Sequence, residues 1–484
     1  MKGGYLRLIL ILFPACLGTI ACDKGQPFDN LPPETSLFLQ DINLTGQNRL
    51  NSVVRLYWSG EDQDGYVVGY EISTDGQTWG VTSSTDSTFF FSIPFGQDSV
   101  DVTLFARAID NDGLADPEPA SLVVPLKNRP PVARFDTVAV LPDTVFSAGT
   151  LLYSIEDPDG NETLERVELK INDGSWMTLP FNSRFLSFLP ETPELAGTQN
   201  LRLFDGPSAL ELSEMLTGAL VDGNNTFYLR AIDIAGISSP IDSTDIFWLR
   251  QKTGTLLLVD DHSDTDADDL HREVLNQVYP SYDVIDIRTN RPNVWDPTLG
   301  LILGVYDRVL WYSDGSDLPT LGEQLTLEIA ATSLQEYLNT GGKLMISAKF
   351  PATFNDPEEA GISPVFDFSP MDSLSSSPGQ ARIPRDSLLE PVGVLTGLID
   401  PIVCGRFITG ADPFYAKDPG NALLDAQLVG VGGWSGPTTV AARTVFTNGE
   451  TNQVFVGVEL HKLDGDRSAL EEFVGWVMNT AFNW

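Results

Sequence analysis

The chain has 484 residues, and at about 150 residues per domain this length predicts about three domains. It carries 29 Lys and Arg against 67 Asp and Glu, so its formal net charge of −38 argues against nucleic acid and against electrostatic docking on anionic lipid. Hydrophobic residues make up 42% of the chain, which is enough to build cores and excludes an acidic disordered tail, while 42 Gly and 32 Pro favour a β-rich, turn-rich architecture.

Residues 1–21 have the pattern of a secretory signal peptide. A basic start leads into the apolar run 8–13, which small residues continue at 15–21, and the whole stretch is too short to span a bilayer. The tetrapeptide Thr-Ile-Ala-Cys at 19–22 then resembles a bacterial lipobox, and the resemblance implies that Cys22 is lipidated and becomes the mature N-terminus. The alternative is an ordinary signal peptide cut just before Cys22. Residues 22–34 read as a polar tether that would follow the anchor.

The lipobox resemblance also implies a location and a set of partners. It predicts a protein of the cell envelope of a Gram-negative bacterium, held at the membrane by its N-terminal lipid, with other envelope proteins or glycans as further partners and no nucleic acid. Of the three cysteines, one lies in the signal peptide and Cys22 would be acylated, so only Cys404 remains. The mature protein is therefore expected to have no internal disulfide, which large cores tolerate.

Two stretches of the chain repeat the same series of motifs. Each has an Asp-x-Asp-Gly turn, then a Trp shortly after a Gly, then the run Arg-Ala-Ile-Asp. The positions are 62–65, 76–79 and 107–110 in the first stretch, and 157–160, 174–176 and 230–233 in the second. Self-similarity at this scale predicts tandem modules, and the short alternating strands between Gly, Asp and Asn turns are typical of antiparallel sandwiches.

These segments resemble bacterial fibronectin type III or immunoglobulin-like modules. The resemblance implies an all-β sandwich at 35–128 and a second at 129–250, with Trp58 as the core aromatic residue of an early strand. The second module is longer because of an insertion around 182–222. A short helix is predicted within that insertion at 209–220.

Carboxylates gather in two loops of the first module. Asp62 and Asp64 share one loop, Asp110 and Asp112 share another, and the resemblance places both loops at the same end of the sandwich. Because Ca²⁺ prefers oxygen ligands, the clustering suggests a calcium site. The alternative is that these residues only form solvated turns.

Near residue 252 the pattern changes to strands that alternate with helices. Apolar strands are predicted at 255–261, 282–287, 306–314 and 343–347, and helices at 266–278 and before the Gly pair at 341–342. This alternation predicts a doubly wound parallel sheet. A capping box of Ser468 and Glu471 is expected to open the last helix. The Ser- and Pro-rich stretch 351–395 is predicted to be a long irregular loop.

Segment 253–484 resembles the class I glutamine-amidotransferase-like domains, which have a flavodoxin-like α/β fold. The clearest similarities lie at 307–311, 337–347 and 457–461. Enzymes of that family use a Cys nucleophile that is activated by His and oriented by Glu. The resemblance therefore allows a direct check of whether this chain keeps the three catalytic residues.

The check predicts a non-catalytic member. Lys349 stands near the nucleophile position, and the glycines that permit the family's sharp turn are absent. His461 matches the family's histidine, but Leu463 stands where the orienting acid should be. No catalytic residue is therefore assigned, and His461 is interpreted as a remnant of the triad.

Acidic residues also follow the first predicted strand of this domain. Asp260, Asp261 and Asp264 lie at the carboxyl end of a parallel strand, where open α/β sheets bind ligands. A divalent cation or a polar ligand is one interpretation. The other is that the acids cap the helix that follows.

Taken as a whole, the sequence predicts a multidomain protein with two β-sandwiches and one α/β domain. The leading hypothesis is an exported, membrane-anchored lipoprotein with a binding or scaffolding role at the cell envelope. The alternative is a metal-assisted hydrolase that uses the acidic cluster after the first α/β strand.

Overall fold

The computed structural model describes residues 29–39, 53–91, 93–315, 325–349, 363–375, 377, 379–446 and 449–482. Cys22 and the rest of the predicted signal peptide lie outside these residues. By its internal contacts the chain divides into two compact units, one ending at Asn128 and the other beginning at Arg129. None of the helices in the described part is both long and apolar enough to cross a membrane.

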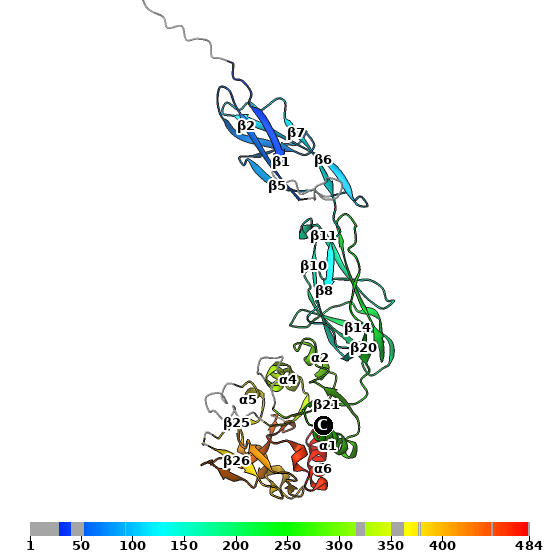
Figure 1. Ribbon diagram of the computed structural model, residues 1–484, viewed down its shortest axis with the longest axis vertical. Coiled ribbons are helices and arrows are strands. Elements are labelled where there is room, and N and C mark those ends of the chain that lie inside the picture. The colour runs from blue at the N-terminus through cyan, green and yellow to red at the C-terminus, as the bar shows by residue number, and fades with distance from the viewer. Residues whose placement is uncertain are drawn as a thin grey trace, which may run out of the picture. The chain divides into compact units, whose positions relative to one another are not determined.

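The first unit is a β-sandwich of two antiparallel sheets (Figure 1). One sheet has the order β1-β2-β5 and the other β4-β3-β6-β7. Their bounds are β1 Glu34–Leu39, β2 Val53–Glu61, β3 Val67–Ser73, β4 Gly80–Thr82, β5 Asp86–Phe90, β6 Ser99–Asp110 and β7 Ala120–Lys127. Trp58, Leu104 and Val124 are buried between the sheets. The prediction that Trp58 lies in the core is confirmed.

The second unit begins with a larger sandwich. A sheet ordered β15-β14-β13-β10-β8, to which β16 adds beside β14, accompanies the sheets β12-β11-β18-β19 and β17-β20-β9. The bounds are β8 Val132–Phe135, β9 Thr144–Phe146, β10 Gly149–Glu156, β11 Leu164–Ile171, β12 Met177–Leu179, β13 Phe185–Pro190, β14 Gly197–Asp205, β15 Leu210–Glu211, β16 Leu216–Val221, β17 Gly223–Asn225, β18 Phe227–Asp233, β19 Asp242–Ser243 and β20 Phe247–Arg250. Predicted β-sandwiches in the first half of the chain are thus confirmed.

The helix predicted at 209–220 is wrong. This segment forms the strands β15 and β16, which both pair with β14. Leu216, Ala219 and Val221 are buried, so the apolar residues of this segment cover the sandwich core. A positive φ of 50° at Ala209 turns the chain into the first of these strands. Tertiary packing has overridden the local helical pattern.

The repeated motifs build the same surface brace in both sandwiches. In the first, the Arg107 guanidinium lies 4.2 Å over the ring of Trp79, and its Nε is 2.6 Å from the Glu71 carboxylate on the neighbouring strand. In the second, the Arg230 guanidinium lies 4.3 Å over the ring of Trp176, and its Nη2 is 2.6 Å from the Glu168 carboxylate. The sequence repeat therefore corresponds to a repeated three-residue contact.

The rest of the second unit is built on a nine-stranded sheet with the order β22-β21-β23-β24-β34-β33-β31-β27-β28. The first five strands are parallel, and they are β21 Leu256–Asp261, β22 Tyr282–Asp286, β23 Arg308–Ser313, β24 Lys343–Ala348 and β34 Thr451–Val456. The other four are antiparallel, and they are β27 Leu388–Pro391, β28 Ile402–Val403, β31 Ala422–Ala426 and β33 Thr439–Val445. The predicted all-parallel sheet is corrected to a mixed one.

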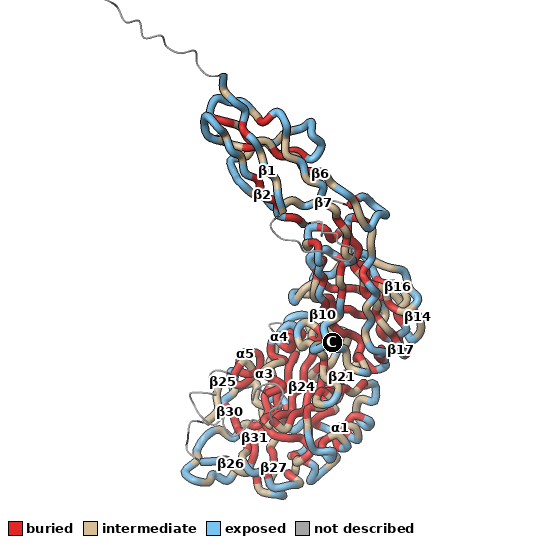
Figure 2. The backbone as a smooth tube through the Cα atoms, turned by 45° about the horizontal axis from the view of Figure 1, so that its top comes forward, coloured by how far each residue is buried: buried red, intermediate tan, exposed pale blue. Residues whose placement is uncertain are grey.

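Helices cover both faces of this sheet (Figure 1). On one side α1 Thr265–Val278 and α6 Arg467–Trp476 enclose one hydrophobic core, and on the other α2 Thr298–Leu303, α3 Thr326–Ile329 and α4 Ala331–Asn339 enclose a second. The residues of the central strands are buried, as Figure 2 shows, and they belong to the cores on both sides of the sheet, which explains their unbroken apolar sequences. Asp466, not Ser468, caps α6, because its side chain accepts the Ser468 N–H at 3.0 Å.

The stretch predicted as an irregular loop is ordered into short elements over its described part. They are α5 Val365–Phe368, β25 Met371–Leu374, β26 Gln380–Ile383 and then β27 of the large sheet. Two small sheets result, because β25 pairs with β30 Phe414–Ala416, and β26 pairs with β29 Ile408–Ala411 and β32 Val429–Val431. The stretch is so rich in Ser and Pro that its sequence pattern does not indicate strands of only four residues.

Candidate functional site

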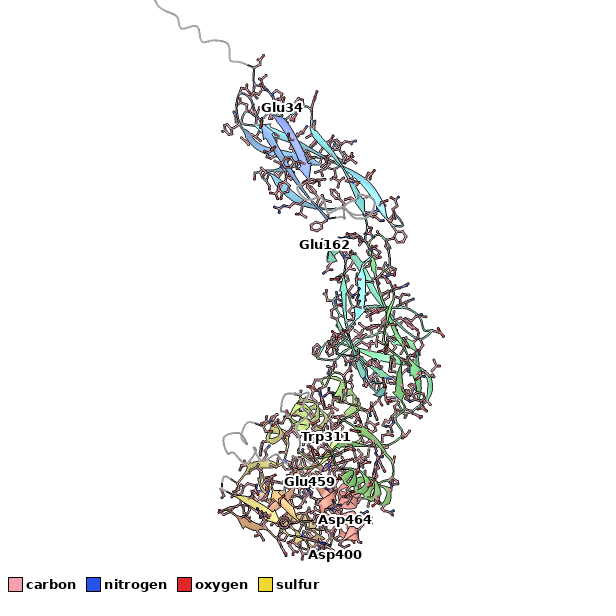
Figure 3. All side chains as sticks on the ribbon, in the orientation of Figure 1. Glu34, Glu162, Trp311, Asp400, Glu459 and Asp464 are labelled. Atoms are coloured by element: carbon pink, nitrogen blue, oxygen red, sulfur yellow. The ribbon has the colours of Figure 1, made fainter. Side chains whose placement is uncertain are left out.

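The carboxyl ends of the parallel strands carry the candidate site. His262 follows β21 directly, while Glu459 and His461 follow β34. Glu459 is labelled in Figure 3, within the α/β domain. The three side chains are buried or nearly so, at 5% exposure for the His262 side chain, 6% for that of Glu459 and 3% for His461. Three polar groups therefore meet in a place that water reaches poorly.

The three side chains contact one another from two separate loops. His262 Nε2 lies 3.3 Å from Glu459 Oε1, and the rings of His262 and His461 meet edge to face with centroids 4.9 Å apart. One nitrogen or oxygen of each residue lies within 4.8 Å of the other two. No other group of three His, Cys, Asp or Glu residues in the described ranges gathers so closely.

The hydrogen bonds of His262 determine where its proton sits. Its Nδ1 accepts the backbone N–H of Asp264 at 2.9 Å, so the neutral ring carries its proton on Nε2 and donates it to Glu459. The other oxygen of Glu459 accepts from Lys462 Nζ. Burial would raise the pKa of Glu459, but these two hydrogen bonds outweigh it and lower the pKa, which keeps the carboxylate ionised.

The ring of His461 differs from the ring of His262 in its hydrogen bonding. Neither of its ring nitrogens has a partner among the described residues. Burial lowers the pKa of His461 to about 4, although the nearby Glu459 acts in the opposite direction. The ring is thus a neutral base in a polar cluster, with both nitrogens unsatisfied, and such groups are rare in folded proteins.

A serine at the end of β24 fixes the turn that presents His461. Ser347 Oγ donates to the carbonyl of Val458 at 3.0 Å and accepts the N–H of Leu460 at 3.1 Å. These bonds tie the segment after β34 to the neighbouring strand. The short 3-10 helix Leu460–Leu463 then turns His461 inward among buried residues.

The residues at and near the catalytic positions of the amidotransferase-like family do not form a nucleophile and an orienting acid. Lys349 follows β24, where the family's nucleophile is expected, and the hydroxyl of the nearby Ser347 is used by the turn just described. The Cys404 thiol is buried, donates to the carbonyl of Arg406 at 2.9 Å, and has its pKa raised by burial. Leu463 is fully buried among apolar residues.

The structure separates the three acids that follow β21. Asp260 Oδ1 accepts the N–H of His262, and burial raises the pKa of Asp260. Asp264 caps α1 through the N–H of Asp266, as the capping interpretation expects. Asp260, near the end of β21, and Asp264, the residue before α1, thus lie on either side of His262, and each accepts a backbone N–H.

Asp261 points into the opposite face of the sheet. It is fully buried, accepts from Trp311 Nε1 at 3.3 Å and lies 3.7 Å from the Arg288 guanidinium. Burial raises the pKa of Asp261 to about 7 despite these partners. Asp314 shares Arg288 at 3.6 Å, so a second polar cluster lies at the ends of β21, β22 and β23.

Of the four acids of the first unit, Asp62, Asp64 and Asp110 each accept a backbone N–H group. Asp110 Oδ1 accepts from the N–H of Asp112 at 2.9 Å, and Asp62 Oδ1 accepts from the N–H of Asp64 at 3.3 Å. Asp64 Oδ2 in turn accepts the N–H of Leu31. One oxygen of Asp62 is buried without a partner in the described part. Turn formation explains most of these contacts, and the calcium hypothesis stays a prediction.

Sequence reasoning missed the pairing of His262 with Glu459. The one indication in the sequence is that both residues follow apolar strands of the parallel sheet, whose carboxyl ends lie at the same edge. Their strands, β21 and β34, are separated in the sheet by β23 and β24, so no local spacing predicts the contact. Glu459 also precedes His461 by two residues, whereas the family pattern directs attention to the residue two positions after it.

Comparisons with known proteins give likenesses for the first half of the chain. No family model matches, and no curated protein matches. Among solved structures, the chain is similar to the fibronectin(III)-like modules of Clostridium thermocellum CbhA, at 13% identity over 45% of this chain and 95% of that one, with a TM-score of 0.18. It is also similar to the central fibronectin-III array of RIM-binding protein, at 11% identity over 46% and 71%, with a TM-score of 0.16.

Proposed function

We propose that this protein is an exported lipoprotein, anchored through Cys22 at the cell envelope of a Gram-negative bacterium, whose α/β domain binds a partner and does not catalyse amide transfer. Envelope proteins and glycans are the proposed partner classes. The lipobox-like sequence at 19–22 and the acidic, nucleic-acid-excluding charge support this assignment.

We further infer that the α/β domain is a non-catalytic relative of the class I glutamine-amidotransferase-like group. Its parallel strands lie in the order β22-β21-β23-β24-β34, which in chain order is 2-1-3-4-5, the flavodoxin-like arrangement. His461 follows the fifth of these strands. Strand order and the position of His461 support the relationship, and the sequence motifs of the group add to it.

One observation carries the preference for binding over catalysis. At the end of β24, the Ser347 hydroxyl is held by the Val458 carbonyl and the Leu460 N–H, and Lys349 stands near the family's nucleophile position. The same edge of the sheet is the place where open α/β folds bind ligands. An edge that keeps the fold's ligand-binding location, has a lysine near the nucleophile position and uses its serine hydroxyl in a structural turn is suited to recognition.

The second sandwich supports this role as a rigid mount for the α/β domain. Phe146, Ala148, Leu189 and Phe204 of the sandwich belong to the same hydrophobic core as α2 and α4. The Thr150 and Thr298 hydroxyls meet across the boundary at 2.5 Å. The shared core holds the second sandwich and the α/β domain in one orientation. A receptor or scaffold needs such a fixed orientation to present one binding surface.

The test is a pull-down from native membranes with the full-length protein and two bulky variants. Ser263 is exposed at the carboxyl edge of the parallel strands, whereas Asn339 is exposed at the amino edge. Ser263→Trp is expected to lose the partner that the wild type captures, because the bulky ring obstructs the binding edge. Asn339→Trp serves as the matched control and is expected to retain it.

The same protein preparation is assayed for glutamine hydrolysis and for general hydrolase activity with Mg²⁺ or Ca²⁺. We expect no turnover. Turnover that Asp261→Ala abolishes would replace the binding proposal by the hydrolase alternative, and equal capture by the wild type and Ser263→Trp would remove the carboxyl edge as the binding surface.

A further inference from the structure

The starting point is the unsatisfied imidazole of His461. It is 3% exposed, and neither Nδ1 nor Nε2 has a hydrogen-bond partner in the described part of the chain. A buried polar group without a partner costs stability and needs an explanation such as a bound ion. The ring also lies edge to face with a second histidine and close to an ionised carboxylate. These neighbours favour a cation.

We propose that His262, Glu459 and His461 bind a divalent transition-metal ion of the Zn²⁺ class. The site lies outside the acids for which sequence reasoning suggested calcium, and it does not depend on the lipid anchor. Two imidazoles and one carboxylate form the three-ligand set found in open zinc sites, which leave a fourth position for water or a ligand. Nitrogen ligands select transition metals, whereas Ca²⁺ takes oxygen ligands.

The distances require only a small closure of the side chains. One potential ligand atom of each residue lies within 4.8 Å of the others. Zn–N and Zn–O bonds of about 2.0–2.2 Å around a tetrahedral ion place ligand atoms about 3.3 Å apart. The three residues come from the turn after β21 and the segment after β34, so closure by 1 to 2 Å, roughly the difference between these separations, leaves the strands in place.

Metal binding requires the other neutral form of His262. In the structure its Nε2 proton is directed at Glu459 and its Nδ1 accepts from Asp264. Coordination through Nε2 moves the proton to Nδ1, so the Asp264 N–H must turn away. Ser263 and Asp264 are exposed residues of a short turn before α1, which confines this change to the surface.

Lys462 provides a test of opposite sign. Its ammonium group is bound to the second oxygen of Glu459, and its side chain is 25% exposed. The positive charge of this ammonium group repels a metal ion that binds the same carboxylate. Lys462→Met should therefore tighten binding, whereas Glu459→Gln should weaken it, since the amide keeps the shape and loses the charge.

The experiment uses the full chain, stripped with a chelator and titrated with Zn²⁺, with Co²⁺ as a spectroscopic probe of tetrahedral coordination. We expect one ion per chain and visible Co²⁺ bands. His461→Phe and Glu459→Gln should each weaken binding by more than about 100-fold, beyond the 10–100-fold typical of outer-shell changes. His271→Asn is the matched control, because it replaces the third histidine and keeps a donor for the Ala267 carbonyl.

Circular dichroism is used to check that each variant is folded. If His461→Phe is not folded, the Zn²⁺ affinity of Glu459→Gln decides the question. Binding of Zn²⁺ that survives both changes within about threefold would show an adventitious ion only, and it would overturn the proposal. Absence of tetrahedral Co²⁺ bands in the wild type would overturn it as well. Neither result bears on the capture of a membrane partner through the carboxyl edge.

Discussion

At the residue scale, the buried histidines give the α/β domain a built-in sensitivity to acid. The His271 ring stacks on Tyr312 with centroids 3.9 Å apart, and its Nδ1 donates to the Ala267 carbonyl at 2.6 Å. Burial lowers the pKa of His271 to about 3. An unfolded chain would instead protonate this residue at its ordinary pKa of about 6.5.

The sign of the effect follows from these two values. Between about pH 6.5 and pH 3 the unfolded state binds a proton that the folded state refuses, so the free energy of unfolding falls as the pH falls. We expect His271 to remove about 2 to 3 kcal/mol between pH 7.5 and pH 4.5. His271→Phe, which keeps a ring on Tyr312, should lose less stability over this interval in chelator-treated protein.

Chemical denaturation at the two pH values measures this difference. A variant with the same loss of stability as the wild type would show that His271 is protonated in the folded state or does not contribute. His262 and His461 are the same in both proteins, so the comparison isolates the contribution of His271.

The candidate site also shows at this scale what sequence can and cannot predict. His461 was found from its place in a family motif, and Asp264 from its position before a helix. The contact of Glu459 with His262 depends on two loops that follow β34 and β21. These loops are far apart in the chain, and their strands are separated in the sheet by β23 and β24. Side chains brought together by tertiary packing leave no local spacing to read.

At the element scale, the surface brace of each sandwich links two adjacent strands and a turn. Glu71 lies on β3, Arg107 on β6 and Trp79 just before β4. Each pairwise contact is partly exposed, so each is expected to be weak, but the planar guanidinium engages the carboxylate and the indole at once.

We predict a measurable coupling between the two contacts of the first brace. Arg107→Met, Trp79→Leu and the double variant should give a coupling energy of about 0.5 to 1 kcal/mol in the unfolding of the first unit. The control is Arg55→Met, whose ion pair with Asp86 is more exposed and should contribute less. Strictly additive effects of the two changes would show that the brace is not a cooperative contact.

Elements were predicted well where the pattern was strong and local. The parallel strands of the α/β domain are buried on both faces and have continuous apolar sequences, so their positions could be read directly. The antiparallel strands β31 and β33 have no such run, and the short strands of 363–395 fall below the length at which alternation is informative. The mixed character of the sheet was therefore missed.

At the scale of the whole molecule, the second sandwich and the α/β domain belong to one compact unit, and the first sandwich forms another. Thr150 lies at the junction inside the second unit. Its hydroxyl contacts Thr298 at 2.5 Å and Ser187 at 2.7 Å, all fully buried. The side chain of Asn293 adds two bonds across the same junction, to the carbonyls of Ala139 and Thr150.

Thr150→Val is therefore expected to destabilise the second unit by about 1 to 3 kcal/mol, because it leaves buried hydroxyls without a partner. Calorimetry of the full chain should show one transition for the first unit, unchanged, and a lowered transition for the second. Thr178→Val, at an exposed position of β12, is the control and should change neither. Separate melting of the second sandwich and the α/β domain in the wild type would contradict a shared core.

The central proposal is a binding protein held at the envelope through Cys22, and the intact mass of the protein purified from native membranes tests it most directly. We predict a mature chain that begins at Cys22 and carries the added mass of acyl chains, and we predict that Cys22→Ser releases the protein from the membrane fraction. A chain that starts at another residue with no lipid mass, or a Cys22→Ser variant that stays membrane-bound, would contradict the account.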